Sequence, residues 1–192
     1  MDLTDKTIGF ALTGSFCTFS RAMEEIKHLA SLQTNLIPIM SETSYQTDTR
    51  FGTAEHWHQT IAEITPNNIV KSVKESEPFG PKGILDLLIV APCTGNTLAK
   101  LASGIADSSV TMAVKAHLRN QRPVLIAVST NDGLGTAAKN IGTLLNCKYL
   151  YFVPFRQDDY IKKPNSLVAD FSQIKEAAEA ALDGRQLQPL LC

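Results

Sequence analysis

The segment from Ile84 to Asp107 constrains the fold of this chain more than any other part of the sequence. It contains an unbroken apolar run, Leu87 to Ala91, which ends abruptly in the small and polar residues Pro92 to Thr97. An apolar run without alternation is typical of a strand buried on both faces, and such strands occur in parallel sheets that helices cover. A helical pattern follows, with Leu98 and Leu101 on one stripe. The segment therefore predicts a buried strand, a polar loop and a helix.

The same alternation of strands and helices extends along the whole chain. Strands are expected at Thr7–Leu12, Asn35–Met40, Leu85–Ala91, Val124–Val128 and Leu150–Val153. Helices are expected from about Ser20 to Ala30, from Asp107 to Leu118, from Thr136 to Leu145, and from a cap at Asp170 or Ser172 to a stop at Gly184. Alternating strands and helices indicate βαβ units. We therefore expect one domain over residues 1–192, an α/β fold with a three-layer, doubly wound parallel sheet of the Rossmann-like type.

Three segments do not follow this alternation. They are Thr43–Glu55, Lys71–Lys82 and Arg156–Ser166, which are polar or charged and are expected to be irregular. Irregular segments of this length in a compact domain are often lids or contacts between subunits.

Charge and cysteine content exclude several classes of protein. The net charge is −1, with 44% hydrophobic and 19% charged residues, so nothing indicates a basic surface for nucleic acid or membranes. No basic segment followed by an apolar one opens the chain, and no apolar stretch approaches the ~18 residues that span a bilayer. The four cysteines, Cys17, Cys93, Cys147 and Cys192, form no CxxC pair and no zinc-binding pattern. We expect reduced thiols in a cytosolic protein without a metal site.

The polar loop after the central apolar run is a candidate ligand site. Ligands of open parallel sheets bind outside the carboxyl ends of the strands. Pro92, Thr94, Gly95, Asn96 and Thr97 lie at such an end and offer backbone donors, hydroxyls and an amide, but no charge. This set of groups suits a polar, planar ligand better than a metal ion.

Two more strand ends carry small and hydroxyl residues. Thr13-Gly14-Ser15-Phe16 follows the first predicted strand and leads into a helix, whose free N–H groups favour a phosphate. A tight turn with a serine cap explains this segment equally well. Ser41 ends the second strand, and its hydroxyl is placed to share the same phosphate, although ordinary turn chemistry explains that residue as well.

Other motifs are explained better by ordinary structural roles. Gly133 to Ala138 fits the spacing GxGxxA, but no clear acidic residue closes the next strand to hold a ribose, so we expect a flexible loop and a helix start. His56 and His58 flank Trp57 and lack a third metal ligand; a partly buried aromatic helix face is favoured over a catalytic or flavin-facing imidazole at a boundary between subunits. Cys93 is expected to be a small packing residue beside a ligand.

Taken together, Gly14-Ser15, Ser41 and the segment Ala91–Asp107 resemble the flavoprotein family of homo-oligomeric flavin-containing cysteine decarboxylases. That family has a Pro-Ala-Ser-Ala-Asn-Thr loop, where this chain has Pro92-Cys-Thr-Gly-Asn-Thr97. The resemblance spans roughly Thr7 to Val128. Within the family, the stretches Thr111–His117, Val153–Asp159 and Lys163–Ala169 resemble a branch from spore-forming bacteria.

The family resemblance implies a site for FMN. Gly14, Ser15 and Ser41 would hold the phosphate, and Pro92–Thr97 would line the ring and its ribityl chain, with Asn96 as the main polar contact. The residues expected to contact the cofactor are Gly14, Ser15, Phe16, Ser41, Pro92, Cys93, Thr94, Asn96 and Thr97. His56 lies roughly where the decarboxylases keep a catalytic histidine, in different surroundings, and no other acid or base is placed.

The branch implies a part in oxidising dihydrodipicolinate to dipicolinate during sporulation, in the cytoplasm of the mother cell. It also implies a partner A subunit that brings NAD(P), and a homo-oligomer built on trimers. The substrate carries two carboxylates, for which the candidate cations are Arg50, Arg156, Lys162 and Lys163; a solvated surface loop is the simpler explanation of the two lysines. The alternatives are a flavin-dependent decarboxylase or prenyl-flavin synthase, and a non-catalytic assembly subunit of a nicotinamide-dependent partner.

Overall fold

A mixed sheet of seven strands forms the centre of the molecule in the computed structural model, which describes residues 1–192. The strands are β1 Thr7–Leu12, β2 Asn35–Met40, β3 Leu87–Cys93, β4 Val124–Thr130, β5 Leu150–Phe152, β6 Phe155–Gln157 and β7 Leu167–Ala169. The α-helices are α1 Phe19–Ser31, α2 Glu42–Gln46, α3 Ala54–Ile64, α4 Val73–Ser76, α5 Phe79–Lys82, α6 Gly95–Ala102, α7 Ser109–Arg119, α8 Ala138–Leu145 and α9 Ile174–Leu182. Two 3-10 turns, η1 Phe16–Thr18 and η2 Phe171–Gln173, precede α1 and α9.

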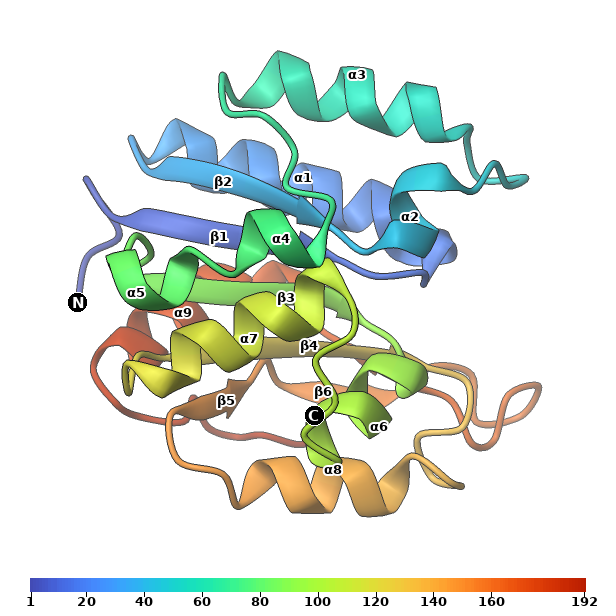
Figure 1. The fold of residues 1–192 in the computed structure, drawn as a ribbon. Coiled ribbons are helices and arrows are strands. Elements are labelled where there is room, and N and C mark those ends of the chain that lie inside the picture. Colours follow the sequence, from blue (N-terminus) through green and yellow to red (C-terminus); the bar gives the residue numbers. More distant parts are fainter.

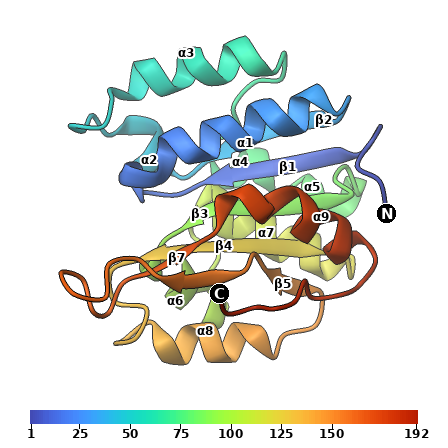
Figure 2. The same ribbon diagram turned by 180° about the vertical axis from the view of Figure 1, so that it is seen from behind.

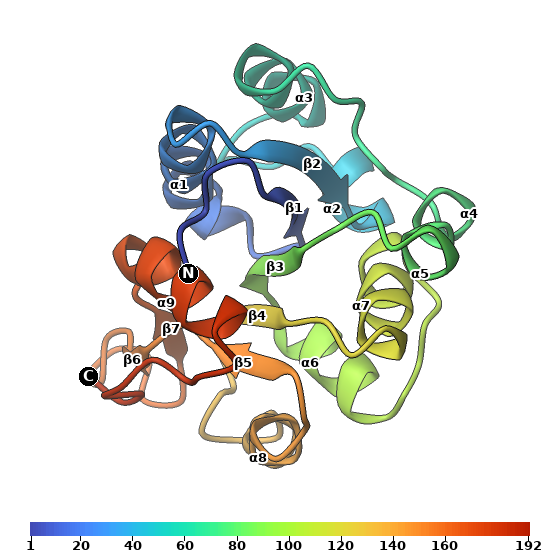
Figure 3. The same ribbon diagram turned by 90° about the vertical axis from the view of Figure 1, so that its left-hand side faces the viewer.

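Helices cover both faces of the sheet and make a three-layer molecule. The front face in Figure 1 carries α4, α5, α6 and α7, whereas α1 and α9 cover the back face seen in Figure 2. The view along the strands in Figure 3 separates these two groups clearly, with α3 beyond the β2 edge and α8 beyond β5. The predicted three-layer α/β architecture is confirmed. None of the helices has the length and apolar character that a membrane crossing requires.

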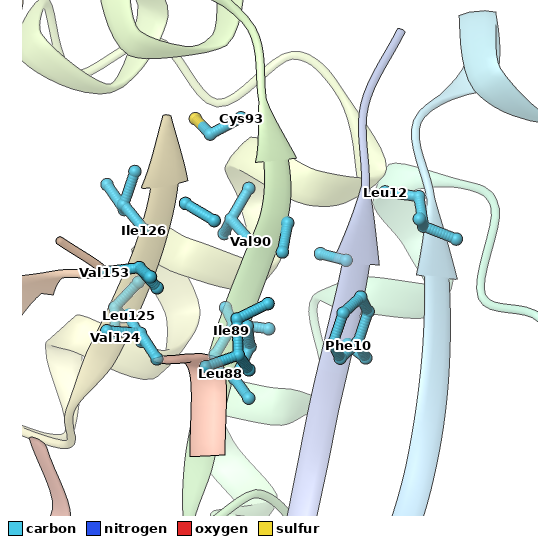
Figure 4. Packing of buried hydrophobic residues seen from close by; sticks show 14 of the residues in the cluster. Phe10, Leu12, Leu88, Ile89, Val90, Cys93, Val124, Leu125, Ile126 and Val153 are labelled. Carbon is cyan, nitrogen blue, oxygen red and sulfur yellow. The ribbon is translucent and has the colours of Figure 1, made fainter. Parts of the chain in front are cut away.

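Five parallel strands run in the order β2-β1-β3-β4-β5. All seven residues of β3 are buried, because the strand lies between β1 and β4 and has helices on both faces. Figure 4 shows the side chains of β1, β3 and β4 packed together, with Cys93 at the carboxyl end of β3. The chain winds in one direction from β1 to β2 and in the other from β3 onward. The carboxyl ends of β1 and β3 therefore form the switch point at which such sheets bind ligands.

The sheet also contains an antiparallel hairpin, which the sequence did not predict. β5 pairs with the first half of the free β4 edge, and β7 pairs antiparallel with Ser129 and Thr130 at its end. β6 then pairs antiparallel with β7. The expectation of an irregular stretch from Arg156 to Ser166 is therefore corrected at both ends, since Arg156 lies in β6 and β7 starts directly after Ser166. Strands of three residues are too short to show a periodic pattern.

The other two segments expected to be irregular contain short helices. Ser41 caps α2 and Thr53 caps α3, in each case by accepting a hydrogen bond from a backbone N–H of the first turn. In the segment from Lys71 to Lys82, Ser72 caps α4, and α5 follows after Pro78. Helices of four or five residues bury too little of one face to produce a readable periodicity.

Gly9 of β1 is a position where any side chain would force its buried neighbours to shift. A methyl group there would lie 2.7 Å from Leu85 Cδ1 and 2.9 Å from Leu88 Cδ1, and both leucines are fully buried. Gly9→Ala is expected to destabilise the protein by about 1–3 kcal/mol, because a well-packed core cannot absorb an extra carbon. Gly142→Ala in α8 is the matched control, since nothing lies within 4 Å of the added carbon. It is expected to gain up to ~1 kcal/mol from helix propensity. Urea unfolding measures both, and equal stability of the two variants would contradict the packing argument.

Candidate functional site

One hydroxyl joins the loops that follow β1 and β3. Thr13 Oγ1 donates to the carbonyl of Pro92 at 2.8 Å and accepts from the backbone N–H of Thr94 at 3.0 Å. The Thr13 side chain is buried, so these bonds are shielded from water. The loop that leads into η1 and the loop that leads into α6 are therefore held side by side at the switch point.

The first turn of α6 leaves donors free at this point. Thr94 Oγ1 caps the helix by accepting from the N–H of Thr97 at 3.2 Å. The N–H groups of Gly95 and Asn96 precede the first intrahelical bond and have no partner upstream in the helix. The side-chain amide of Asn96 is exposed and makes no hydrogen bond to the protein. These groups form an uncharged donor set at a helix N-terminus, where anions and polar ligands are favoured.

Two adjoining hollows open beside these loops. The larger has a volume of about 770 Å³, and its lining combines residues from the carboxyl ends of β1, β3 and β4 with the 49–51 turn and the β6–β7 hairpin. The smaller, of about 420 Å³, has no hydrophobic residue in its lining, which includes Thr13, Ser41, Thr43, Thr97 and Ser108. Gly14, Thr94 and Asn96 line both hollows and form the wall between them. The turns near residues 14, 41 and 94 thus meet at one edge of the sheet.

The larger hollow combines aromatic, hydroxyl and cationic groups. Phe16 and Phe51 lie in its lining, with Leu167 and Val168 of β7. Ser15 Oγ is 2.8 Å from Ser129 Oγ, so two hydroxyls from different strand ends share one hydrogen bond. Arg21, Arg50 and Lys163 supply positive charge to this hollow.

The end of β4 contributes a part of the site that the sequence did not lead us to expect. Ser129, Thr130, Asn131 and Asp132 all line the larger hollow, and Thr130 Oγ1 donates to Asp132 Oδ1 at 2.5 Å. A side chain at Gly95 would lie 2.6 Å from Thr130 Oγ1, so glycine is what allows this loop to approach α6. The sequence pattern that could have predicted this part of the site is the polar segment Ser129–Asp132, which directly follows a predicted parallel strand.

The turn before α3 presents Arg50 and Phe51 to the larger hollow. Thr49 and Gly52 exchange two backbone hydrogen bonds, of 3.0 and 3.1 Å. Asp48 Oδ1 accepts from the N–H of Ala54 at 2.8 Å. Gly52 has φ +146°, and an added carbon there would lie 2.8 Å from the Trp57 ring nitrogen. The turn is therefore fixed to the start of α3.

The smaller hollow is lined by hydroxyls together with three charged side chains that already have partners. Ser41 Oγ accepts from Ser44 N at 3.2 Å, so this serine has the ordinary turn role that its position also allows, and it still lines the hollow. The Glu42 carboxylate accepts from Ser109 N at 3.1 Å, at the start of α7. Lys100 Nζ lies 2.8 Å from Asp107 Oδ1 and holds the pKa of that carboxyl below its usual value.

Several predicted site residues lie outside both hollows. Pro92 and Cys93 are buried at the end of β3 and line neither hollow, and burial raises the pKa of the Cys93 thiol far above its usual value. Their contribution is the backbone, because the Pro92 carbonyl accepts from Thr13. Arg156 and Lys162 are exposed and also lie outside the two linings, whereas Arg50 and Lys163 are within the larger one.

The histidine pair lies on α3, away from the hollows. His56 is exposed, lies against Trp57 with 4.8 Å between ring centroids, and lines neither hollow. His58 stacks on Tyr45 at 4.1 Å and its Nε2 is 2.9 Å from the Tyr45 carbonyl oxygen. The structure of this chain therefore gives the weak catalytic candidate His56 no contact with the site.

The GxGxxA segment, expected to be a flexible loop and a helix start, leads into α8, which begins at Ala138, and its Gly133 has a packing role that the sequence did not predict. A carbon added at Gly133 would lie 2.5 Å from Leu167 Cγ, so glycine lets the loop after β4 pack against β7.

Comparison with known proteins agrees with this architecture. The B subunit of dipicolinate synthase from Bacillus subtilis (strain 168) is 42% identical over 189 residues, which are 98% of this chain and 94% of that protein. The crystal structure of the B subunit of dipicolinate synthase from Bacillus halodurans C matches with a TM-score of 0.92 and 44% identity, over 100% of this chain and 98% of that one. A dodecameric FMN-dependent UbiX-like decarboxylase from Escherichia coli O157:H7 shares the fold, with a TM-score of 0.59 and 19% identity over 72% of this chain and 75% of that chain.

The family comparison covers strands β1 to β6, the whole lining of the smaller hollow and all of the larger one except Leu167 and Val168. The family described as Flavoprotein matches residues 1–166, a range that includes the ends of β1, β2, β3 and β4 and the hairpin residues Asp158 and Lys163. This match and the relative that is 42% identical over 98% of the chain show that the chain belongs to the Flavoprotein family.

Proposed function

We propose that this chain is the B subunit of a dipicolinate synthase and holds FMN in the two adjoining hollows. Together with an A subunit that uses NAD(P), it takes part in oxidising dihydrodipicolinate to dipicolinate during sporulation, in the cytoplasm of the mother cell. The full-length similarity to the B subunits of two dipicolinate synthases supports this proposal. The dodecameric relative supports a homo-oligomer, which we propose is built on trimers.

The observation that carries the proposal is the wall between the hollows. On one side, Gly14, Thr94 and Asn96 face a hollow without hydrophobic residues. On the other, they face a hollow that contains aromatic rings and arginines. FMN has the same division, with a phosphorylated polar arm and a flat ring. Ser15, Ser41 and Thr97 supply further hydroxyls along the strand ends. The donor set therefore fits this cofactor.

The roles of the residues follow from their positions. Gly14, Ser15 and Ser41 would hold the phosphate, and Asn96 with the free N–H groups of α6 would hold the polar atoms of the ring. Phe16 and Phe51 would cover the ring and limit its contact with water. FMN, when bound, supplies a two-electron acceptor, while the protein binds and orients the reactants.

An absorbance titration tests the proposal. The purified protein is expected to be yellow or to take up added FMN, with a shifted and sharpened flavin spectrum, both alone and with the A subunit. Failure to bind FMN at millimolar concentration in either state would contradict it. The position of His56 outside the hollows gives no support to the decarboxylase alternative.

A further inference from the structure

We propose that this chain also binds the substrate, and that Arg21 and Arg50 each hold one of its two carboxylates in the larger hollow. The ligand class is a planar heteroaromatic or dihydro-heteroaromatic dicarboxylate. The inference rests on the proposed function, because it assigns residues of the same site to the substrate. It adds that the substrate lies on this chain, and it assigns a role to Arg21, which no sequence motif singles out.

The cations around the hollows differ in whether they already have partners. Lys163 Nζ is 2.6 Å from Asp158 Oδ2, and Lys100 of the smaller hollow is 2.8 Å from Asp107. Arg21 and Arg50 make no ion pair and no hydrogen bond within the chain, and the guanidinium of Arg50 only approaches the Phe51 ring, at 4.8 Å from its centroid. Of the three cationic side chains in the larger hollow, these two arginines are therefore the ones without an ion-pair or hydrogen-bond partner. Each has five N–H donors in a planar fork, which matches a carboxylate.

The two arginines are presented by fixed backbone. Arg21 is the third residue of α1, and its neighbours Phe19 and Ala22 are fully buried beneath the helix. Arg50 lies in the turn that Thr49 and Gly52 close by two backbone hydrogen bonds. Little backbone ordering is needed on binding, which leaves more of the contact energy as affinity.

The shape and lining of the larger hollow suit a second flat ligand beside the cofactor. Its volume of about 770 Å³ lies within the usual range for small-molecule sites of about 300–1,000 Å³. Phe16, Phe51, Leu167 and Val168 provide apolar surface for rings, which the smaller hollow lacks. The phosphate-bearing arm would lie along Gly14 and Ser41 of the smaller hollow and reach Ser15 at the border of the larger one, so the rest of the larger hollow is left for flat groups.

Two carboxylates line this hollow; Asp158 is paired with Lys163, so Asp132 is the one whose charge opposes a dianion. Asp132 has no cationic partner, and its Oδ1 is held by Thr130. A carboxylate at this position repels a second carboxylate, so binding depends on both arginines. Asp132 also provides an independent test. Removing its charge should strengthen dicarboxylate binding, whereas removing Arg21 or Arg50 should weaken it.

Isothermal titration with pyridine-2,6-dicarboxylate tests the proposal on the full-length protein, with and without FMN, in buffer containing EDTA because this ligand chelates metals. Pyridine-2-carboxylate is the matched probe with one carboxylate, and we expect it to bind at least about tenfold more weakly. Arg21→Gln and Arg50→Gln are each expected to weaken dicarboxylate binding by about tenfold or more, and Asp132→Asn to strengthen it by a few-fold.

Two exposed lysines outside the hollow supply the controls. Lys27→Gln removes a charge from the same helix as Arg21, and Lys162→Gln removes one from the hairpin tip; neither should change binding. Equal affinity for the two probes, unchanged binding in both arginine variants, or no dicarboxylate binding by a protein that binds FMN would overturn the inference. Dicarboxylate binding with the expected variant pattern in a protein that takes up no FMN would support it, while contradicting the proposed cofactor.

Discussion

Replacing Ser15 and Asn96 together by alanine is expected to raise the Kd for FMN by about 100-fold, because each loss removes a hydrogen bond to a polar or charged group of the ligand. The fold should not change, since the Asn96 amide has no partner in the protein and the Ser15 hydroxyl bonds only the side chains of Ser129, at 2.8 Å, and Cys17, at 3.8 Å. The activity of the reconstituted A–B pair should fall as FMN affinity is lost. The measurements are an FMN titration followed by absorbance, and the rate of dipicolinate formation.

The matched control is Ser20→Ala with Asn140→Ala. Both residues lie in helices, and neither lines a hollow or makes a side-chain hydrogen bond. FMN affinity and activity should stay at the original level. An activity that survives the loss of Ser15 and Asn96 would favour a purely non-catalytic role in assembly and would contradict a redox role for this chain.

Acid pH is expected to lower the free energy of unfolding, because it favours protonation of the buried His117 of α7. Its side chain is fully buried, and its Nε2 is 3.0 Å from the carbonyl oxygen of Pro123. A carbonyl only accepts, so Nε2 donates and the neutral ring leaves Nδ1 bare; Nδ1 is buried without a partner. Burial is the main reason that the pKa of His117 falls to about 4; Arg122 adds to the lowering, and the hydrogen bond to Pro123 and the Asp86 carboxylate oppose it. A proton on Nδ1 would have no acceptor.

The sign of the effect follows from where the proton binds. Between pH 6.5 and about 4 the unfolded chain carries a proton on this histidine and the folded chain does not. The neutral ring therefore makes its full contribution to the free energy of unfolding above about pH 6.5. This contribution falls as the pH drops, by up to ~3 kcal/mol near pH 4.

His117→Gln provides the comparison, because glutamine keeps an N–H donor for Pro123 and does not titrate. The free energy of unfolding in urea, measured from pH 8 to pH 4, should fall more steeply for the original protein than for the variant. All other titrating groups are shared, so their effects cancel in the difference. Parallel curves would show that His117 takes up its proton equally easily in both states.

Buried strands were the most predictable part of this fold. The bounds of β1 and β2 agree with the sequence prediction residue for residue, because each is an apolar run flanked by polar or small residues. The winding of a parallel sheet then placed the turns after β1, β2 and β3 at one edge, so Gly14, Ser41 and Asn96 could be expected as neighbours from the sequence alone.

The parts that were missed depend on tertiary contacts. β6 and β7 have three residues each and exist because the end of β4 offers a free edge. Arg21 belongs by sequence to an ordinary amphipathic helix, and only the meeting of α1 with the 49–51 turn brings it to the hollow. Cys93 was expected to be a small packing residue beside a ligand; β3 extends two residues beyond its predicted end and buries it, which agrees with the packing role.

The two hydrogen bonds of the Thr13 hydroxyl couple the positions of the loops that follow β1 and β3. Because this one group fastens both loops, a substitution that displaces the turn after β1 also displaces the start of α6. A substitution in the 49–51 turn or the β6–β7 hairpin leaves both hydrogen bonds of Thr13 in place, so the outer rim of the larger hollow can change without moving the two joined loops. On the proposed function, substitutions at this rim would alter contacts to the flat rings and leave the proposed phosphate contacts of Gly14 and Ser41 intact.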